Sequence, residues 1–211
     1  MTEDTQGDAP QLYLIAPALI PAAELGPVLA DVLDAHPVAC LRLQGGGGDE
    51  QELGRLADLA RDLAHARDVA VVIEDHLPLV QRHGLDGVHL TTGARGVRYA
   101  RKELGADAII GAFCNGSRHE GMSAGESGAD YVSFGPCGPS ALGRGEPVGL
   151  ELFQWWSEMI EVPVVAEGAL DAALIGRLWG VADFIAIGPE IWSAPDPAAA
   201  LAALWAAPRE M

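Results

Sequence analysis

The stretch VAVVIEDHLPLVQRHGLDGVHLT, residues 69–91, shows how this chain is built. It begins with a short apolar run, residues 69–75, and ends with a second one, residues 87–91. Runs of this length without polar alternation are typical of strands that are buried on both faces. The HLPLVQRHG segment between them has the character of a helix. Strand, helix and strand in this order predict a parallel unit with a helical crossover.

The same unit recurs along the chain, with strand-like runs that start about every 25 residues. Eight such runs are found, at residues 11–18, 38–44, 69–75, 87–91, 108–114, 131–136, 162–168 and 184–189. Helical patterns lie between them, and in residues 49–68 apolar side chains recur at every third or fourth position with charged ones opposite. After the last run, Asp196 as N-cap and Pro197 at the first helical position mark a final helix. The pattern predicts a (βα)8 TIM barrel.

An open, doubly wound sheet is the competing architecture, because it shows the same alternation of strand and helix. Two observations disfavour it. No G-x-G-x-x-G motif follows the first run, where APALIPAAEL stands at residues 16–25. Eight evenly spaced strands also exceed what a small dinucleotide-binding domain carries. We therefore expect a single barrel domain over residues 11–211, after a disordered acidic tail over residues 1–10.

Composition excludes several classes of protein. Of the 211 residues, 49% are hydrophobic and 20% charged, enough apolar material for one large core. The formal net charge of -17 would repel nucleic acid and anionic membranes, so neither is expected as a partner. No apolar run reaches the roughly 18 residues of a membrane span, and no secretory signal pattern begins the chain. Three cysteines do not make a disulfide framework, which favours a reducing cytoplasm.

Polar residues cluster where the predicted strands end, which is where a TIM barrel carries its active site. They are Arg42, Gln44, Glu74, Asp75, His76, His89, Thr91, Thr92, Cys114, Asn115 and Glu167. We expect the ligand-binding residues among them.

The Glu74-Asp75 pair is open to two interpretations. Carboxylates at a strand end suit Mg²⁺, with Glu74 as a second carboxylate where the strand ends and the chain turns. Asp75 could instead cap the helix that follows. His89 alternates with apolar neighbours, a pattern more typical of a hydrogen-bonded residue inside the barrel than of a catalytic base.

Two glycines stand at the ends of the seventh and eighth predicted strands, at Gly168 and Gly188. Phosphate-binding barrels place backbone N–H groups there, so we expect a phosphate site, with Pro189 contributing no donor. The loop GPCGPSALGRG, residues 135–145, is long enough for a substrate lid, and its Arg144 suits a phosphate or pyrophosphate.

The cysteines and tryptophans are expected to pack rather than react. Cys114 and Cys137 follow consecutive strands without an obvious base. The tryptophans are expected on the outside of the barrel or at a homodimer contact, at Trp155, Trp156, Trp179, Trp192 and Trp205.

Three segments carry a resemblance to a known family. They are VIEDHLPLVQRHGLDGVHL (72–90), GADYVSFGP (128–136) and VPVVAEGAL (162–170). Together they resemble the thiamine phosphate synthase family, including its thiazole tautomerase branch, over residues 11–192. The resemblance implies a TIM barrel that binds a small phosphorylated heterocycle. It also implies a reaction with Mg²⁺ that joins hydroxymethylpyrimidine pyrophosphate to thiazole phosphate and releases pyrophosphate.

Carried over by position, the resemblance is incomplete in the first half of the chain. Arg42 matches the family's strand-2 arginine, but Gln44 replaces its lysine. Glu74 stands where the family has asparagine, and Asp75 matches a metal-binding aspartate. The second metal aspartate of the family has no counterpart, since residues 91–93 read Thr-Thr-Gly.

The second half departs in a similar way. Ser140 matches the first threonine of a T-P-T-K motif, whose lysine is missing, and Arg144 stands one place late. Gly168 keeps the first glycine of a Gly-Gly turn, which implies a place in substrate binding. Asn115 takes the place of the tautomerase branch's histidine, with His119 only nearby.

These departures leave two functions open. Loss of pyrophosphate concentrates negative charge on the leaving group, so missing cations should slow the reaction. The first hypothesis is an attenuated synthase in which Arg42, Ser140 and Arg144 are catalytic. Its substrate-binding set is Gln44, Glu74, His89, Asn115, Gly168 and Gly188. The alternative is a catalytically degenerate paralogue, or a tautomerase-like protein, that binds a phosphorylated heterocycle without synthase activity.

Overall fold

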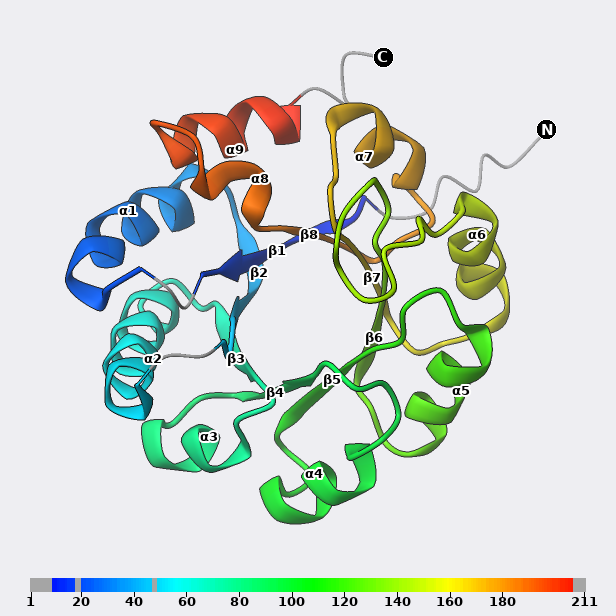
Figure 1. Ribbon diagram of the computed structural model, residues 1–211, viewed down its shortest axis with the longest axis horizontal. Helices are drawn as coiled ribbons and strands as arrows, with labels where there is room; N and C mark the ends of the chain where they lie inside the picture. The colour runs from blue at the N-terminus through cyan, green and yellow to red at the C-terminus, as the bar shows by residue number, and fades with distance from the viewer. Residues whose placement is uncertain (1–8, 18–19, 47–48, 207–211) are drawn as a thin grey trace.

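The eight predicted strands form one closed parallel barrel (Figure 1). The structure, a computed structural model, describes residues 9–17, 20–46 and 49–206. Each strand pairs with the next along the chain, and β8 pairs with β1. The strands are β1 (Gln11–Ala16), β2 (Val38–Leu43), β3 (Ala70–Glu74), β4 (Gly87–Leu90), β5 (Ile109–Phe113), β6 (Tyr131–Phe134), β7 (Val164–Glu167) and β8 (Phe184–Ile187). The predicted (βα)8 barrel is confirmed; most of the predicted tail, residues 1–8, lies outside the described residues.

Helices surround the barrel as an outer ring (Figure 1). They are α1 (Ala22–Ala35), α2 (Glu50–His65), α3 (Leu77–His83), α4 (Val97–Leu104), α5 (Arg118–Glu126), α6 (Leu150–Met159), α7 (Ala172–Leu178), α8 (Pro189–Trp192) and α9 (Pro197–Ala206). The outer ring of helices is completed where the last helix, α9, packs against the first, α1. Within the described ranges, no helix combines the length and apolarity that crossing a membrane requires.

Two helices begin at an aspartate that caps them, and one of these, Asp196, was predicted from the sequence. The carboxylate of Asp49 accepts a hydrogen bond from the Gln51 N–H (3.2 Å) at the start of α2. Asp196 accepts one from the Ala199 N–H (3.0 Å), with Pro197 as the first residue of α9. Each carboxylate satisfies an N–H that the helix leaves without an internal partner.

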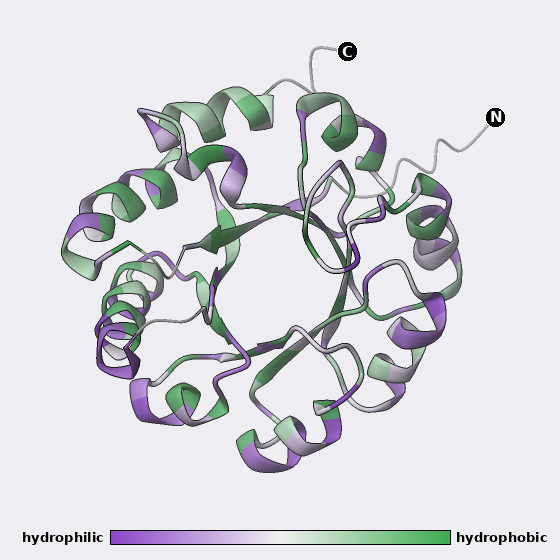
Figure 2. Ribbon diagram, in the orientation of Figure 1, coloured by the Kyte–Doolittle hydropathy of each residue, from purple (hydrophilic) through white to green (hydrophobic). Residues whose placement is uncertain are grey.

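The strands consist largely of hydrophobic residues (Figure 2), and alternate ones pack against the helices. Leu12, Leu14, Leu41 and Leu43 are buried there in the main core. Because neighbouring residues of a strand point to opposite faces, the residues between them point into the barrel. The apolar part of this interior contains Tyr13, Ile15, Cys40, Val72, Tyr131, Val165 and Ala186. Polar side chains lie above it, toward the carboxyl ends of the strands.

An aromatic cluster fixes α6 on the outside of the barrel. The Trp156 ring lies 4.9 Å from the Phe134 ring of β6, centroid to centroid, and its indole N–H donates to the Val162 carbonyl (2.7 Å). Gly121 of α5 makes room, since a Cβ there would lie 2.7 Å from the indole. Trp156 is only 1% exposed, because it covers the outer face of β6 beneath α6, in keeping with the expectation that the tryptophans cover the outside of the barrel. The homodimer contact stays a prediction.

Candidate active site

Five strands each place one polar side chain inside the barrel near its carboxyl end. They are Arg42 on β2, Glu74 on β3, His89 on β4, Ser133 on β6 and Glu167 on β7. Strand register aligns them, because Glu74 pairs with His89 across β3 and β4. The alternation of side chains along each strand then turns all five inward. The barrel interior thus contains a connected polar network.

Arg42 is the centre of this network and is 3% exposed. Its guanidinium lies 2.5 Å from a carboxylate oxygen of Glu167 and 3.1 Å from one of Glu74. Burial alone would lower the pKa of Arg42, but its interactions with Glu167, Tyr13 and Glu74 together outweigh burial and raise the pKa, so the guanidinium stays charged. Two carboxylates therefore surround one cation.

The two carboxylates differ in their other partners. Glu167 is 1% exposed, and Ser133 Oγ donates to its Oε1 at 2.5 Å. Glu74 lies nearer solvent, and its Oε2 accepts from the Gly45 N–H at 3.2 Å. Burial raises the pKa of Glu74 although Arg42 pulls it the other way. A proton entering the network will therefore bind Glu74 more readily than it would a solvated carboxylate.

His89 is held as a neutral ring. Its Nε2 lies 2.9 Å from a guanidinium nitrogen of Arg42, which can only donate. Nδ1 therefore carries the proton and donates to the Tyr131 hydroxyl (2.9 Å), which in turn lies 2.7 Å from the Tyr13 hydroxyl. Burial, and then the charge of Arg42, lower the pKa of His89 far below its ordinary value. The favoured interpretation, a hydrogen-bonded residue inside the barrel, agrees with this geometry.

A cavity of about 320 Å³ opens above Arg42 at the carboxyl ends of the strands. The residues that line it come from the ends of β1, β2, β7 and β8 and from the loop after β6. Four predicted site residues meet here: Arg42, Gln44, Ser140 and Gly168. His89 lies below the cavity and is 1% exposed, so no ligand in it touches the imidazole.

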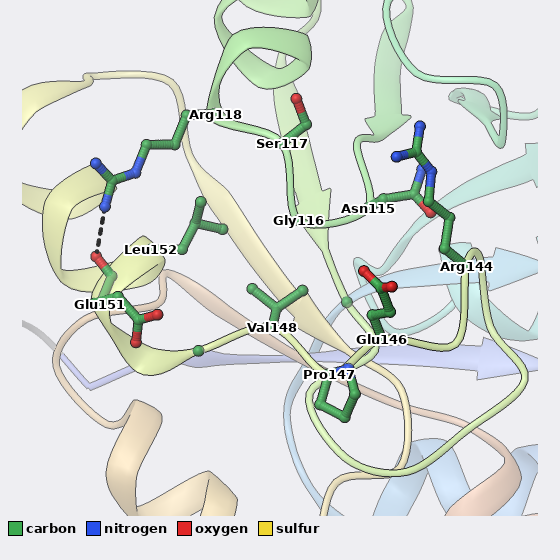
Figure 3. Close-up of a pocket in the computed structure, with 12 residues that line it drawn as sticks. Asn115, Gly116, Ser117, Arg118, Arg144, Glu146, Pro147, Val148, Glu151 and Leu152 are labelled. Carbon is green, nitrogen blue, oxygen red and sulfur yellow. Dashed lines mark hydrogen bonds between the residues drawn. The ribbon is translucent and has the colours of Figure 1, made fainter.

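A second cavity of about 420 Å³ lies on the other side of the loop after β6 (Figure 3). Asn115 and Arg144 both line it. The side-chain oxygen of Asn115 is buried, and no hydrogen-bond donor reaches it from the described residues. The Arg118 guanidinium donates to the Glu151 carbonyl (3.3 Å) at the far wall.

The loop between β6 and α6 therefore separates residues that the sequence motif grouped together. It folds over the mouth of the barrel (Figure 1), with Ser140 facing one cavity and Arg144 the other. Ser140 and Arg144, both expected to be catalytic, therefore line different cavities. The chain turns between the two side chains at Gly143, whose φ is 57°.

The expected magnesium ligands diverge. Both Asp75 oxygens accept from Thr91, one from its N–H (2.9 Å) and one from its hydroxyl. Glu74 instead points into the barrel toward Arg42, so its expected role as a second carboxylate ligand is wrong. The alternative N-cap role is wrong too, because His76 is the N-cap of α3 and no side chain caps that helix. Across the described ranges, no three His, Cys, Asp or Glu side chains are arranged to hold a metal ion.

The two glycines at the ends of β7 and β8 differ. Gly168 has φ 91°, and a Cβ there would lie 3.0 Å from Pro136, so the tight approach of the two loops needs glycine. The Gly188 N–H, expected to face a phosphate, donates instead to Oε2 of Glu190 (2.8 Å). Oε1 of the same carboxylate accepts from the Leu170 N–H (3.1 Å).

Several residues of the site were not assigned from the sequence. Glu167 stood among the polar strand ends without a role, although VVAE ends as VVIE does at Glu74. Ser133 was the only polar side chain inside the short run YVSF apart from its tyrosine. Glu190 showed no signal, because an acidic residue after a glycine and a proline is common in loops.

A closed barrel with a charged cavity at the carboxyl ends of its strands defines a TIM-barrel protein with its ligand site in the usual place. The family model described as thiamine monophosphate synthase matches residues 12–191. The chain belongs to this family, as its three motif segments indicated.

Relatives along the whole chain agree. A thiamine-phosphate synthase of Rhodospirillum centenum is 42% identical over 197 residues, which cover 91% of this chain and 94% of the relative. One of Erythrobacter litoralis is 38% identical, covering 90% and 91%. The solved thiamine phosphate pyrophosphorylase of Pyrococcus furiosus shares the fold, with a TM-score of 0.82 at 22% identity, covering 95% of this chain and 96% of that one. The resemblance to the tautomerase branch stays a prediction.

Proposed function

We propose that this protein joins hydroxymethylpyrimidine pyrophosphate to thiazole phosphate and releases pyrophosphate. The observation that carries the proposal is the cavity above Arg42, which gathers four of the expected site residues in a chain of the synthase family. A new bond joins the pyrimidine to the thiazole as the bond to pyrophosphate breaks. The small phosphorylated heterocycle is then the ligand of this cavity.

The roles of the side chains follow from their chemistry. The Gln44 amide and the Ser140 hydroxyl are neutral donors at the cavity wall, suited to substrate oxygens. Arg42 supplies positive charge at the floor, reduced by its two carboxylate partners. Arg144 reaches the same ligand only if the loop after β6 shifts, in keeping with the expected lid. We therefore expect slow catalysis.

The competing proposal is a protein that binds the heterocycle without catalysing the transfer. The ion pairs of Arg42 favour it, because a guanidinium already held by Glu74 and Glu167 has less charge to offer a leaving pyrophosphate. In this case the substrates bind and no new bond forms. A tautomerase-like activity would need a base, and the buried His89 does not provide one.

Incubation with both substrates and Mg²⁺ separates the two proposals. We expect thiamine phosphate to form, with a rate that falls in Ser140→Ala and Arg144→Gln. Arg118→Gln is the control, since Arg118 lies at the far wall of the second cavity with its guanidinium over Trp155. If concentrated enzyme yields no thiamine phosphate while both substrates bind, the protein is the non-catalytic relative.

Magnesium is part of this proposal only through the substrate. Because no three metal-ligating side chains converge in the described part of the chain and Asp75 already accepts from Thr91, Mg²⁺ alone should bind weakly. Pyrophosphate should strengthen its binding by adding oxygen ligands. Calorimetry of native protein and Asp75→Asn, with and without pyrophosphate, measures this. Identical titrations of the two proteins would remove Asp75 from the metal site.

A further inference from the structure

One carboxylate joins the loops that follow β7 and β8. Leu170 lies three residues after β7, and its N–H donates to Glu190 Oε1 at 3.1 Å. Gly188 follows β8 directly, and its N–H donates to Glu190 Oε2 at 2.8 Å. Each carboxylate oxygen thus takes one backbone donor from a different loop. Two N–H groups that converge on one anionic group form an anion-binding cradle, here filled by the protein's own side chain.

The position of this cradle matters for ligand binding. Barrels that bind phosphate frequently do so with backbone N–H groups of the loops after strands 7 and 8. A phosphate oxygen and a carboxylate oxygen compete for the same N–H donors, and two anions at hydrogen-bond distance repel each other strongly. The Glu190 carboxylate and a phosphate therefore exclude each other from the Leu170 and Gly188 amides.

The charges around the cavity strengthen this exclusion. Glu190 lines the cavity above Arg42, together with Glu167. Among the described residues that line it, Arg42 is the one cation, and Glu167 and Glu74 already neutralise it. A dianion entering with Glu190 in place meets no uncompensated positive charge. Glu190 itself is half-buried, so its side chain has a path to solvent.

We propose that Glu190 is an internal competitor for phosphate and sets the affinity of this cavity for phosphorylated ligands. In the free protein it occupies the Leu170 and Gly188 N–H groups, and it leaves them when a phosphate enters. The inference rests on the proposed function for the place of the substrate, because the thiazole phosphate is taken to bind in this cavity. Glu190 would then determine specificity by weakening, rather than strengthening, the binding of phosphorylated ligands.

Titration with inorganic phosphate, followed by the NMR signals of the Leu170 and Gly188 backbone amides, tests the proposal directly. We expect Glu190→Gln to bind phosphate about 10-fold more tightly than the native protein, because the neutral amide is a weaker competitor for N–H donors. Glu190→Ala should bind more tightly still. Glu158→Gln, which removes the same charge from the exposed side of α6, should bind phosphate as the native protein does.

Three results would overturn the proposal. Equal phosphate affinity of native protein and both Glu190 variants would show that the carboxylate does not compete. Weaker phosphate binding in both variants would show that Glu190 holds the two amides in place for phosphate instead of competing with it. An equal gain in Glu158→Gln would reduce the effect to net charge.

Phosphate binding needs no catalysis, so this titration decides the role of Glu190 even if no thiamine phosphate is formed. If the synthase reaction proceeds, Glu190→Gln should lower KM for thiazole phosphate and leave kcat within about 2-fold. A fall in kcat at unchanged KM would contradict the role.

Discussion

Arg42→Met should lower the free energy of unfolding by about 3–5 kcal/mol, because it leaves buried carboxylates without their counter-charge. Of the partners in the described ranges, the Glu167 carboxylate would keep the Ser133 hydroxyl and the Glu74 carboxylate the Gly45 N–H. His89 Nε2 would lose its donor as well. Urea unfolding at pH 7, followed by circular dichroism, measures the loss.

The loss should shrink as the pH falls. Burial already raises the pKa of Glu74, and without Arg42 that pKa rises further above the unfolded value of about 4.3. Between the unfolded and the folded pKa the folded state binds more protons, so stability increases as the pH falls toward about 5. Arg55→Met is the control, since its ion pair with Glu52 is exposed and should contribute little. Equal losses in the two variants would contradict the buried network.

Trp156→Ala should cost about 3–5 kcal/mol of stability, the usual loss for a fully buried tryptophan. The indole is 1% exposed, packs edge to face on Phe134 and donates to the Val162 carbonyl. Its removal opens a large cavity between α6 and β6. Since α6 follows the loop that separates the two cavities, the variant should also bind substrates more weakly. Thermal unfolding and substrate titration measure the two effects.

Trp155→Ala provides the matched control. Trp155 is the neighbouring residue of α6 but only half-buried, with the Arg118 guanidinium 4.5 Å above its ring. We expect Trp155→Ala to lose less than half of the stability that Trp156→Ala loses, since solvent already reaches the Trp155 ring. A Trp155 loss as large as that of Trp156 would show that α6 is packed differently.

The fold was predictable from local pattern because each strand is apolar enough to be buried on both faces. All eight runs became strands, and Asp196 marks a helix start in sequence as in structure. The family resemblance was readable for the same reason, since its motifs lie at strand ends. The direction of the Glu74 side chain could not be predicted from the sequence. Only the exact end of β3 decides whether this side chain faces the barrel interior or the solvent.

The sequence by itself determined the barrel, its eight units and the family, since these depend on hydrophobic periodicity and on motifs within single segments. Tertiary structure alone decided which side chains meet. Arg42 meets Glu167 across the barrel, although 125 positions separate them in the chain. Ser140 and Arg144, four positions apart, face different cavities because the loop turns between them. Glu190 reaches the amides of two loops because the parallel pairing of β7 with β8 places the ends of these strands side by side. Distances across a closed sheet depend on strand order and register, and no local pattern encodes them.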